Sequence, residues 1–263
     1  MPMDEPRVIH PSAVVDPKAQ LGSGVKVGPY AVIGPHVIVN DQAEIGAHAV
    51  IDGHSVIGQG SRIFSFASIG QPPQDTHYAG EPTRVEIGMR CAIREYVSIH
   101  RGTEGGGGLT RVGNDCMIMA YAHVAHDCRV GDHVIMANGT TLAGHVEIQD
   151  YAVIGGLTAI HQFARIGRNA FIGGASAVSM DVVPFVSAAG NRAKITGVNV
   201  VGLRRHGFSE ETIKAIRQAY RIVFRSNLRM EQAVEELERH LSQCVEVQYI
   251  LEFLQTGQRG ICR

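Results

Sequence analysis

A six-residue repeat of large aliphatic side chains runs through most of this 263-residue sequence. It occupies every sixth position over residues 9–69 and again over 87–99, then shifts by one residue and continues over 112–178. A second column, four positions further on, holds almost only Ala, Val, Ser, Thr and Cys. Neither an amphipathic helix nor an alternating strand has this period, so the sequence predicts a solenoid of stacked coils.

The period also predicts the shape of each coil. Three short flat sides of six residues make one turn of 18 residues, and neighbouring coils pair as parallel strands about 4.8 Å apart. The large column fills the interior, and the small column lies where the chain bends. The small column includes Cys91, Cys116 and Cys128, which we expect in the core. The repeat fails over 70–84 and 101–111, which we expect to bulge outward as loops; the glycines at 105–108 lack the G-K-[ST] of a phosphate-binding loop.

The repeat stops at Pro184, and helical periodicity replaces it. The stretch "SEETIKAIRQAYRIVFRS" begins with Ser209 as a helix N-cap, and two further helices are expected before Gly257. We therefore predict an all-β solenoid over residues 1–190, with its two external loops, and an α-helical domain over 191–263.

Composition excludes several classes of function. Lys and Arg number 24 against 25 Asp and Glu, so no global field attracts nucleic acid. The N-terminal stretch lacks the features of a signal peptide, and no 18-residue apolar run follows, so we expect a cytoplasmic protein without a membrane span. The five cysteines form no C-x-x-C pair, which argues against a disulfide framework or a zinc ribbon.

Histidines are the side chains that the coil geometry brings together. Residues 18 apart lie one above another, so Gly144 stacks over His126 and Gln162 over Gly144. Within about two coil rises, roughly 10 Å, one edge of the solenoid gathers several histidines that occupy no inward column. These are His123, His126, His145 and His161.

These histidines could be unrelated surface residues, and two functional interpretations are open besides. A zinc site needs three or four ligands that close on one point, but the pair here is H-x-x-H, unlike the H-x-x-x-x-H of γ-carbonic anhydrase solenoids. We therefore expect no metal. In the other interpretation one imidazole acts as a general base, and Asp127 orients His126. Adjacent strand residues normally point to opposite faces, which weakens that role for Asp127.

Several motifs resemble the family of bacterial UDP-N-acetylglucosamine O-acyltransferases, which begin lipid A synthesis. They are "PPQDTHYAGEPTR" in the first loop, "IHRGT", "AHVAHD", "TLAGHV", "IGGLTAIHQF" and "GLRRHGFS". The match runs in order from about residue 8 to the C-terminus. The combination of Q-D-x-x-Y-x-G-E-P-T with A-H-x-x-H-D is its most specific part.

The resemblance implies a left-handed parallel β-helix that forms a homotrimer with active sites between subunits. It implies transfer of a 3-hydroxyacyl chain from acyl carrier protein to the 3-hydroxyl of UDP-N-acetylglucosamine, without a cofactor, a metal or a covalent enzyme intermediate.

The resemblance also assigns roles to residues. His126 would be the general base beside Asp127, and the Gly144 N–H would stabilise the oxyanion. Gly174 would set the acyl-chain length, because a chain running along the solenoid edge from His126 would pass it. The expected substrate-binding residues are Asp75, Gln74 and His123 for the sugar, His145, His161 and Gln162 for the donor or acyl chain, and Asn199, Arg204 and Arg205 in "GVNVVGLRRHGF", the arginines as phosphate partners.

Three positions depart from the family pattern, and other functions stay open. His77, Val201 and His206 stand where Lys, Glu and Arg are common, which affects the expected contacts to the nucleotide. The alternatives are a related acyltransferase with an acyl-coenzyme A donor, a UDP-sugar acceptor with a 3-amino group, and a non-catalytic scaffold.

Overall fold

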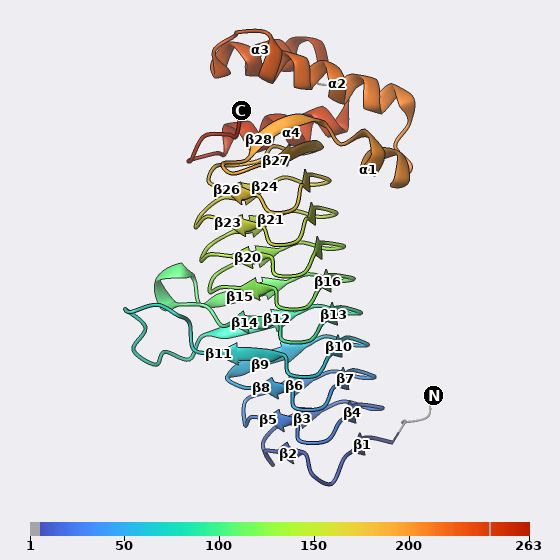
Figure 1. The fold of residues 1–263 in the computed structure, drawn as a ribbon, viewed down its shortest axis with the longest axis vertical. Coiled ribbons are helices and arrows are strands. Elements are labelled where there is room, and N and C mark those ends of the chain that lie inside the picture. Colours follow the sequence, from blue (N-terminus) through green and yellow to red (C-terminus); the bar gives the residue numbers. More distant parts are fainter. Residues whose placement is uncertain (1–5, 242) are drawn as a thin grey trace.

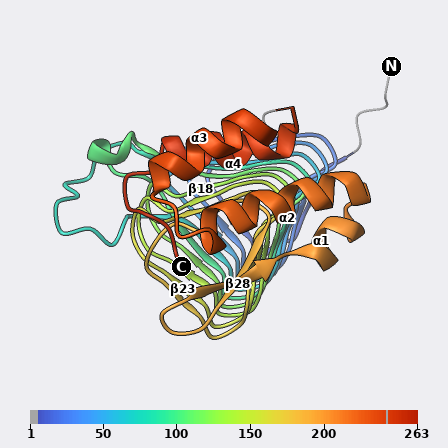
Figure 2. The ribbon, with the colours of Figure 1, turned by 90° about the horizontal axis from the view of Figure 1, so that it is seen from above.

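A left-handed parallel β-helix carries a helical cap at its C-terminal end. The computed structural model describes residues 6–241 and 243–263. Figure 1 shows the coils stacked in one column, and Figure 2, seen along the column, shows their triangular cross-section. The fold predicted from the six-residue repeat is confirmed.

Each side of the triangle is one sheet, and the chain passes through sheets A, B and C in turn. Sheet A contains β1 (Val8–Ile9), β4 (Lys26–Val27), β7 (Glu44–Ile45), β10 (Arg62–Ile63), β13 (Ala92–Ile93), β16 (Met117–Ile118), β19 (Ile135–Met136), β22 (Val153–Ile154), β25 (Phe171–Ile172), β27 (Val186–Ala189) and β28 (Lys194–Val198). Sheet B contains β2 (Val14–Val15), β5 (Val32–Ile33), β8 (Val50–Ile51), β11 (Ser68–Gln71), β14 (Ser98–His100), β17 (His123–Val124), β20 (Thr141–Leu142), β23 (Ala159–Ile160) and β26 (Ala177–Val178). Sheet C contains β3 (Gln20–Leu21), β6 (Ile38–Val39), β9 (His54–Ile57), β12 (Arg84–Ile87), β15 (Leu109–Val112), β18 (Arg129–Val130), β21 (Glu147–Ile148) and β24 (Arg165–Ile166).

The parallel pairing fixes which residues lie above one another. Val124 pairs with Leu142, and Leu142 pairs with Ile160, so residues 18 apart share a rung position as predicted. The two interruptions leave this register intact because both connect sheet B to sheet C and project from the same corner of the triangle. They lie between β11 and β12 and between β14 and β15.

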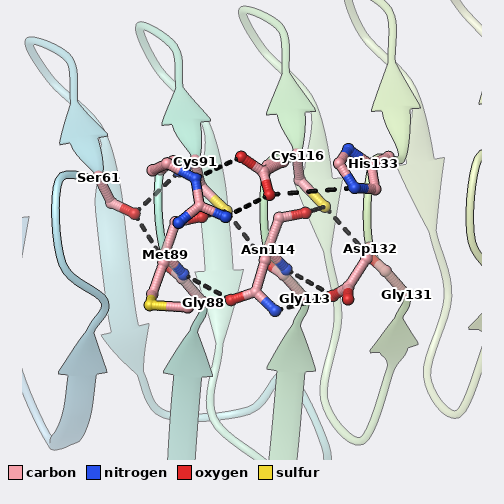
Figure 3. A network of polar contacts seen from close by, with 12 residues as sticks. Ser61, Gly88, Met89, Cys91, Gly113, Asn114, Cys116, Gly131, Asp132 and His133 are labelled. Atoms are coloured by element: carbon pink, nitrogen blue, oxygen red, sulfur yellow. Dashed lines mark hydrogen bonds and ion pairs between the residues drawn. The ribbon is translucent and has the colours of Figure 1, made fainter.

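Both inward columns are buried from Val25 onward, including the polar members of the small column. Ser61, Cys91 and Cys116 occupy successive coils at one corner, and each donates to a carbonyl oxygen one coil further on (Figure 3). The acceptors are the carbonyl oxygens of Gly88, Gly113 and Gly131, at 2.7, 3.0 and 3.1 Å. The cysteines are thus core residues that also satisfy buried backbone acceptors. Cys128 is buried in the same column.

The corners share one backbone conformation that matters for function. The third residue after most strands has a positive φ, and at the corner between sheets B and C (the B–C corner) this residue is Asp127, His145 or Phe163, with φ of 60, 60 and 64°. A left-handed residue reverses the alternation of side chains that an extended strand would impose. Neighbouring side chains at a corner can therefore lie close together on the outside.

The C-terminal segment closes the last coil. Strand β28 pairs antiparallel with β27, so sheet A continues into the segment beyond residue 190. Ser209 caps α2 by accepting from the Thr212 N–H, as predicted. Arg165 ties α4 to the solenoid, because it pairs with the buried Asp181 and donates to the Phe253 carbonyl. The helices are α1 (Val200–Arg205), α2 (Glu210–Arg225), α3 (Met230–Leu241) and α4 (Val245–Gln255), and none of these has the length and apolarity to cross a membrane.

Candidate active site

Polar residues gather at the B–C corner, where both external loops leave the solenoid. His126 and Asp127 follow β17, and Gly144 and His145 follow β20, one coil further on. The second external loop contributes a short 3-10 turn, η1 (Glu104–Gly106). The corner thus combines segments from two coils and a loop.

His126 and Asp127 form a hydrogen-bonded pair although they are adjacent in sequence. The His126 Nδ1 lies 2.8 Å from the Asp127 Oδ2, and both residues are buried. The positive φ of Asp127 turns its side chain back toward the imidazole, so the objection from strand alternation does not apply. An ionised carboxylate can only accept, so the proton lies on Nδ1 and Nε2 keeps a free lone pair.

The Asp127 carboxylate receives further donors from the second loop. The Thr103 N–H lies 2.9 Å from Oδ1, and the Thr103 hydroxyl lies 2.6 Å from Oδ2. The Asp127 backbone N–H donates to the Thr110 hydroxyl at 2.8 Å. These bonds offset the cost of burying a charge in a side chain that has no exposed surface. Neither threonine is indicated by the repeat, because both lie where it is interrupted.

Gly144 lies directly against the imidazole of His126. A Cβ at this position would lie 2.5 Å from His126 Cε1, so only glycine fits. Among the described residues, the Gly144 N–H has no hydrogen-bond partner. The second residue of a corner does not donate to the neighbouring coil's backbone, and prolines stand there at Pro29 and Pro35. This corner therefore offers an unused N–H beside His126.

His145 and His123, two further histidines of the predicted cluster, make different contacts. His145 packs edge-on to His126 with 5.1 Å between ring centroids, and its Nε2 lies 3.8 Å from the Asp127 Oδ2. His123 lies within β17, on the flat side before this corner, and its Nδ1 lies 2.7 Å from the Ser98 hydroxyl oxygen. Burial lowers the pKa of both His123 and His145, which favours their neutral forms.

His100 joins the cluster without having been predicted. Its ring lies 5.0 Å from that of His123, and its buried Nδ1 has no partner among the described residues. Burial, together with the nearby His123 and His126, lowers its pKa to about 4. In the sequence it follows the inward Ile99, and the six-residue period alone does not mark that position as part of the cluster.

The first loop brings Asp75 within electrostatic range of His126 and His145. The His77 N–H donates to the Asp75 Oδ1 at 2.8 Å, and this bond holds the pKa of Asp75 below its usual range. The His77 ring lies 3.0 Å from the same oxygen. Gln74 is exposed beside them. Asp75 is thus less exposed than Gln74 and His77 on either side of it.

The remaining expected substrate-binding residues divide between the B–C corner and the region of α1. His161 and Gln162 follow β23 at the B–C corner, where the His161 Nδ1 lies 3.0 Å from the Gln162 carbonyl oxygen. Asn199 caps α1 and donates to Asn169, which lies at the corner between sheets C and A. Arg204 pairs with Glu210 at 2.7 Å, whereas Arg205 forms no ion pair within the described residues.

Gly174 is not on the edge that carries His126. It follows β25 at the corner between sheets A and B (the A–B corner), three sheet-B rungs beyond β17. The expectation that one solenoid edge runs from His126 past Gly174 is therefore wrong for a single chain. Residues share a corner only when a multiple of 18 positions separates them, and Gly174 lies 48 positions after His126, so it falls on a different corner.

Three side chains at the corner are close enough together to be considered as metal ligands. One ligand atom each from His126, Asp127 and His145 lies within 4.8 Å of the others, the single such group found in residues 6–241 and 243–263. Its carboxylate already accepts from His126 and Thr103. The arrangement fits a hydrogen-bonded acid–base pair in which both oxygens of the buried carboxylate accept hydrogen bonds.

A groove of about 1200 Å³ begins beside this corner. His145 and Phe163, whose rings stack at 4.5 Å, line one end, and Tyr249 and Phe253 of α4 line the other. Between them the groove follows the outer face of sheet C. The corner is thus open toward the helical cap.

Comparisons with known proteins identify the family of the whole chain. A model of the bacterial transferase hexapeptide repeat matches residues 18–53 and 109–144, and a model described as UDP-N-acetylglucosamine O-acyltransferase, domain 2, matches residues 181–262. The chain is 52% identical, over 97% of its length and 99% of the relative's, to the acyl-[acyl-carrier-protein]--UDP-N-acetylglucosamine O-acyltransferase of Myxococcus xanthus. The enzyme of that name from Halorhodospira halophila is 50% identical with the same coverage.

The chain belongs to this acyltransferase family. Solved structures agree: LpxA from Acinetobacter baumannii is 43% identical with a TM-score of 0.95, covering 97% of this chain and 100% of that one. The UDP-N-acetylglucosamine acyltransferase from Bacteroides fragilis is 39% identical with a TM-score of 0.94 and the same coverage. The resemblance seen in the motifs is confirmed.

The buried His100 makes the stability of the acyltransferase depend on pH. Its pKa is about 4 in the folded chain and about 6.5 when unfolded, so the unfolded state binds more protons between these values. Stability should therefore fall as pH drops from 6.5 toward 4. We expect the loss of unfolding free energy between pH 7 and pH 5 to be about 2 kcal/mol smaller in His100→Leu than in wild type.

Urea unfolding at both pH values measures this difference. His10→Leu, at an exposed position near the N-terminus, serves as the control and should behave as wild type. An equal loss in His100→Leu and wild type would contradict the proposed cost of protonating His100.

Proposed function

We propose that this protein transfers a 3-hydroxyacyl group from acyl carrier protein to the 3-hydroxyl of UDP-N-acetylglucosamine, the first step of lipid A synthesis, in the cytoplasm. The observation that carries the proposal is the His126–Asp127 pair beneath the unused Gly144 N–H. The names of relatives 50–52% identical over nearly the full chain support the choice of both substrates.

The chemistry follows from the three groups at the corner. The His126 Nε2 accepts the proton of the sugar 3-hydroxyl as its oxygen attacks the thioester carbonyl carbon. The Gly144 N–H stabilises the oxyanion of the tetrahedral intermediate, and Asp127 stabilises the imidazolium that forms. Collapse of the intermediate breaks the carbon–sulfur bond, and the thiolate takes the proton back from His126. No metal or covalent enzyme intermediate enters.

The surrounding side chains divide between the two substrates in this proposal. Asp75, Gln74 and His123 hold the sugar, since a carboxylate and neutral imidazoles accept hydrogen bonds from its hydroxyls. His145, His161 and Gln162 contact the donor on the rungs beyond His126. The low pKa values of His123 and His145 suit hydrogen bonding by neutral rings beside a catalytic imidazolium.

A homotrimer completes the site in this proposal. Asn199 and Arg205 lie near the C–A corner of the chain, away from its own His126, so a neighbouring subunit would bring them to the nucleotide. Sheet A offers a surface for such packing, because its outward row turns apolar in the middle coils. Met117 and Phe171 are 38% and 41% exposed, with Ile135 and Val153 stacked between them. The matching row of sheet C includes Arg111, Arg129, Glu147 and Arg165.

The same apolar row supports Gly174 as the acyl-chain ruler. Gly156 lies one coil before Gly174 at the same A–B corner, so two successive rungs carry no side chain there. An acyl chain held between sheet A of one subunit and the B–C corner of its neighbour would run past both glycines. Open space at Gly174 favours a long hydroxyacyl chain.

Replacing the base tests the function. His126→Ala should lower turnover by about 10²–10⁴-fold, the usual effect of losing a general base. The assay uses hydroxyacyl carrier protein and UDP-N-acetylglucosamine, with the thermal melting temperature (Tm) measured in parallel. His36→Ala, exposed at the same B–C corner several coils earlier, should keep wild-type turnover.

Turnover within a few-fold of wild type in a folded His126→Ala protein rejects the proposed base. The same assay with acyl-coenzyme A, or with a 3-amino sugar, distinguishes the alternative substrates. Loss of activity on chelation, with recovery on adding zinc, favours the metal interpretation, and inactivity with every substrate favours a scaffold.

The ruler proposal predicts a graded effect. Gly174→Met should shift preference to shorter acyl chains, and Gly156→Met, one rung of about 4.8 Å nearer to the His126 level, should shift it further. Each methylene that loses its apolar contact costs about 0.8 kcal/mol, so blocking several changes preference more than tenfold. The measurement is kcat/KM over a series of 3-hydroxyacyl donors. An unchanged chain-length profile in active, folded variants would remove the ruler role.

A further inference from the structure

We propose that Thr103, on the second external loop, is a positioning residue that holds Asp127 against His126, and that residue 106 is glycine so that this loop can close over the carboxylate. The inference rests on the proposed function, because it assigns the loop a role in orienting the general base. It extends the site to a segment whose glycine run the repeat leaves unexplained.

The first observation is that Thr103 and His126 share one oxygen atom. The Thr103 hydroxyl lies 2.6 Å and the His126 Nδ1 lies 2.8 Å from the Asp127 Oδ2. The Thr103 N–H takes the other carboxylate oxygen at 2.9 Å. One residue thus binds both oxygens, which fixes the rotation of the carboxylate plane. The position of His126 depends on that rotation.

The second observation fixes the direction of the hydroxyl proton. The Thr103 Oγ1 accepts from the Gly106 N–H at 3.1 Å, as the cap of the 3-10 turn η1. A hydroxyl has one proton, and with an acceptor lone pair engaged by Gly106 that proton is directed to the Asp127 carboxylate. An ionised carboxylate cannot donate in return, so Thr103 stabilises the charged form that His126 needs.

The third observation concerns the loop backbone. A Cβ on Gly106 would overlap the carboxyl group of Asp127, whereas a Cβ on Gly105 would meet nothing within 4 Å. The loop is held in this place by β12, since Arg84 donates its N–H to the Gly108 carbonyl and Gly102 donates to the Arg84 carbonyl. The 3-10 turn therefore covers Asp127 and leaves its side chain no exposed surface.

These contacts act on the reaction through His126. Water is kept from Asp127, so the carboxylate orients the imidazole and stabilises the imidazolium in a site of low dielectric. A carboxylate free to rotate would let Nε2 move away from the substrate hydroxyl, and small misplacements of a reacting group cost up to about 10²-fold in rate.

The first experiment replaces the hydroxyl with a methyl group of the same shape. Thr103→Val should lower kcat at least about tenfold and leave KM for UDP-N-acetylglucosamine within twofold, because Thr103 binds Asp127, which orients the base, and has no proposed contact with the sugar. Thr103→Ser keeps the hydroxyl and should restore most of kcat. The acidic limb of the kcat/KM profile should move to higher pH in Thr103→Val, since Oδ2 then offers its full charge to His126.

The second experiment tests the loop without removing any hydrogen-bonding side chain. Gly106→Ala should lower kcat in the same way, whereas the matched Gly105→Ala variant should behave as wild type. This pair keeps the inference testable if Thr103→Val does not fold. Circular dichroism and Tm verify that each variant is folded.

The outcomes separate the inference from the proposed function. If His126→Ala is inactive but Thr103→Val and Gly106→Ala keep wild-type kcat and pH profiles, the positioning role is overturned and the base remains. If Thr103→Val raises KM alone, Thr103 contacts substrate and is no positioning residue. If His126→Ala is itself active, the proposed function fails first.

Discussion

Parallel pairing of consecutive coils is the constraint on which the rest of this structure depends. Each strand contributes only a few residues, so the coil is held by its neighbours above and below and by two inward columns. This pairing fixes the register to one residue and brings His126 and Gly144 into contact although 18 positions separate them. Register in this fold therefore brings together the residues of the candidate site.

The corner brings together side chains and a backbone N–H that a flat sheet would keep apart. Its third residue is left-handed, which turns Asp127 toward the side chain before it, and its second residue leaves a backbone N–H unused. Most corners of the solenoid share this conformation. The B–C corner differs because two external loops leave the coil there, and the second one buries the carboxylate with Thr103. In the proposed function, this burial and the added donors are what make the B–C corner differ from the others.

The sequence predicts the fold almost completely, because one period with two columns determines sides, rungs and core residues such as Cys116. It also predicts that Gly144 stacks on His126. It does not predict the contacts of Thr103 and Thr110, since an interruption of the repeat carries no information on how the loop folds back. It misplaces Gly174 for another reason: the 18-residue coil assigns this residue to the A–B corner, but the repeat does not give the path of a substrate along the surface.

A crystal structure of the protein with its proposed product, UDP-3-O-(3-hydroxyacyl)-N-acetylglucosamine, tests the central claim most directly. We expect the sugar 3-oxygen within about 3.2 Å of the His126 Nε2 and the acyl carbonyl oxygen at the Gly144 N–H. The phosphates should lie beside Arg205 of a neighbouring subunit. A well-ordered product whose 3-oxygen lies away from His126 would contradict the account.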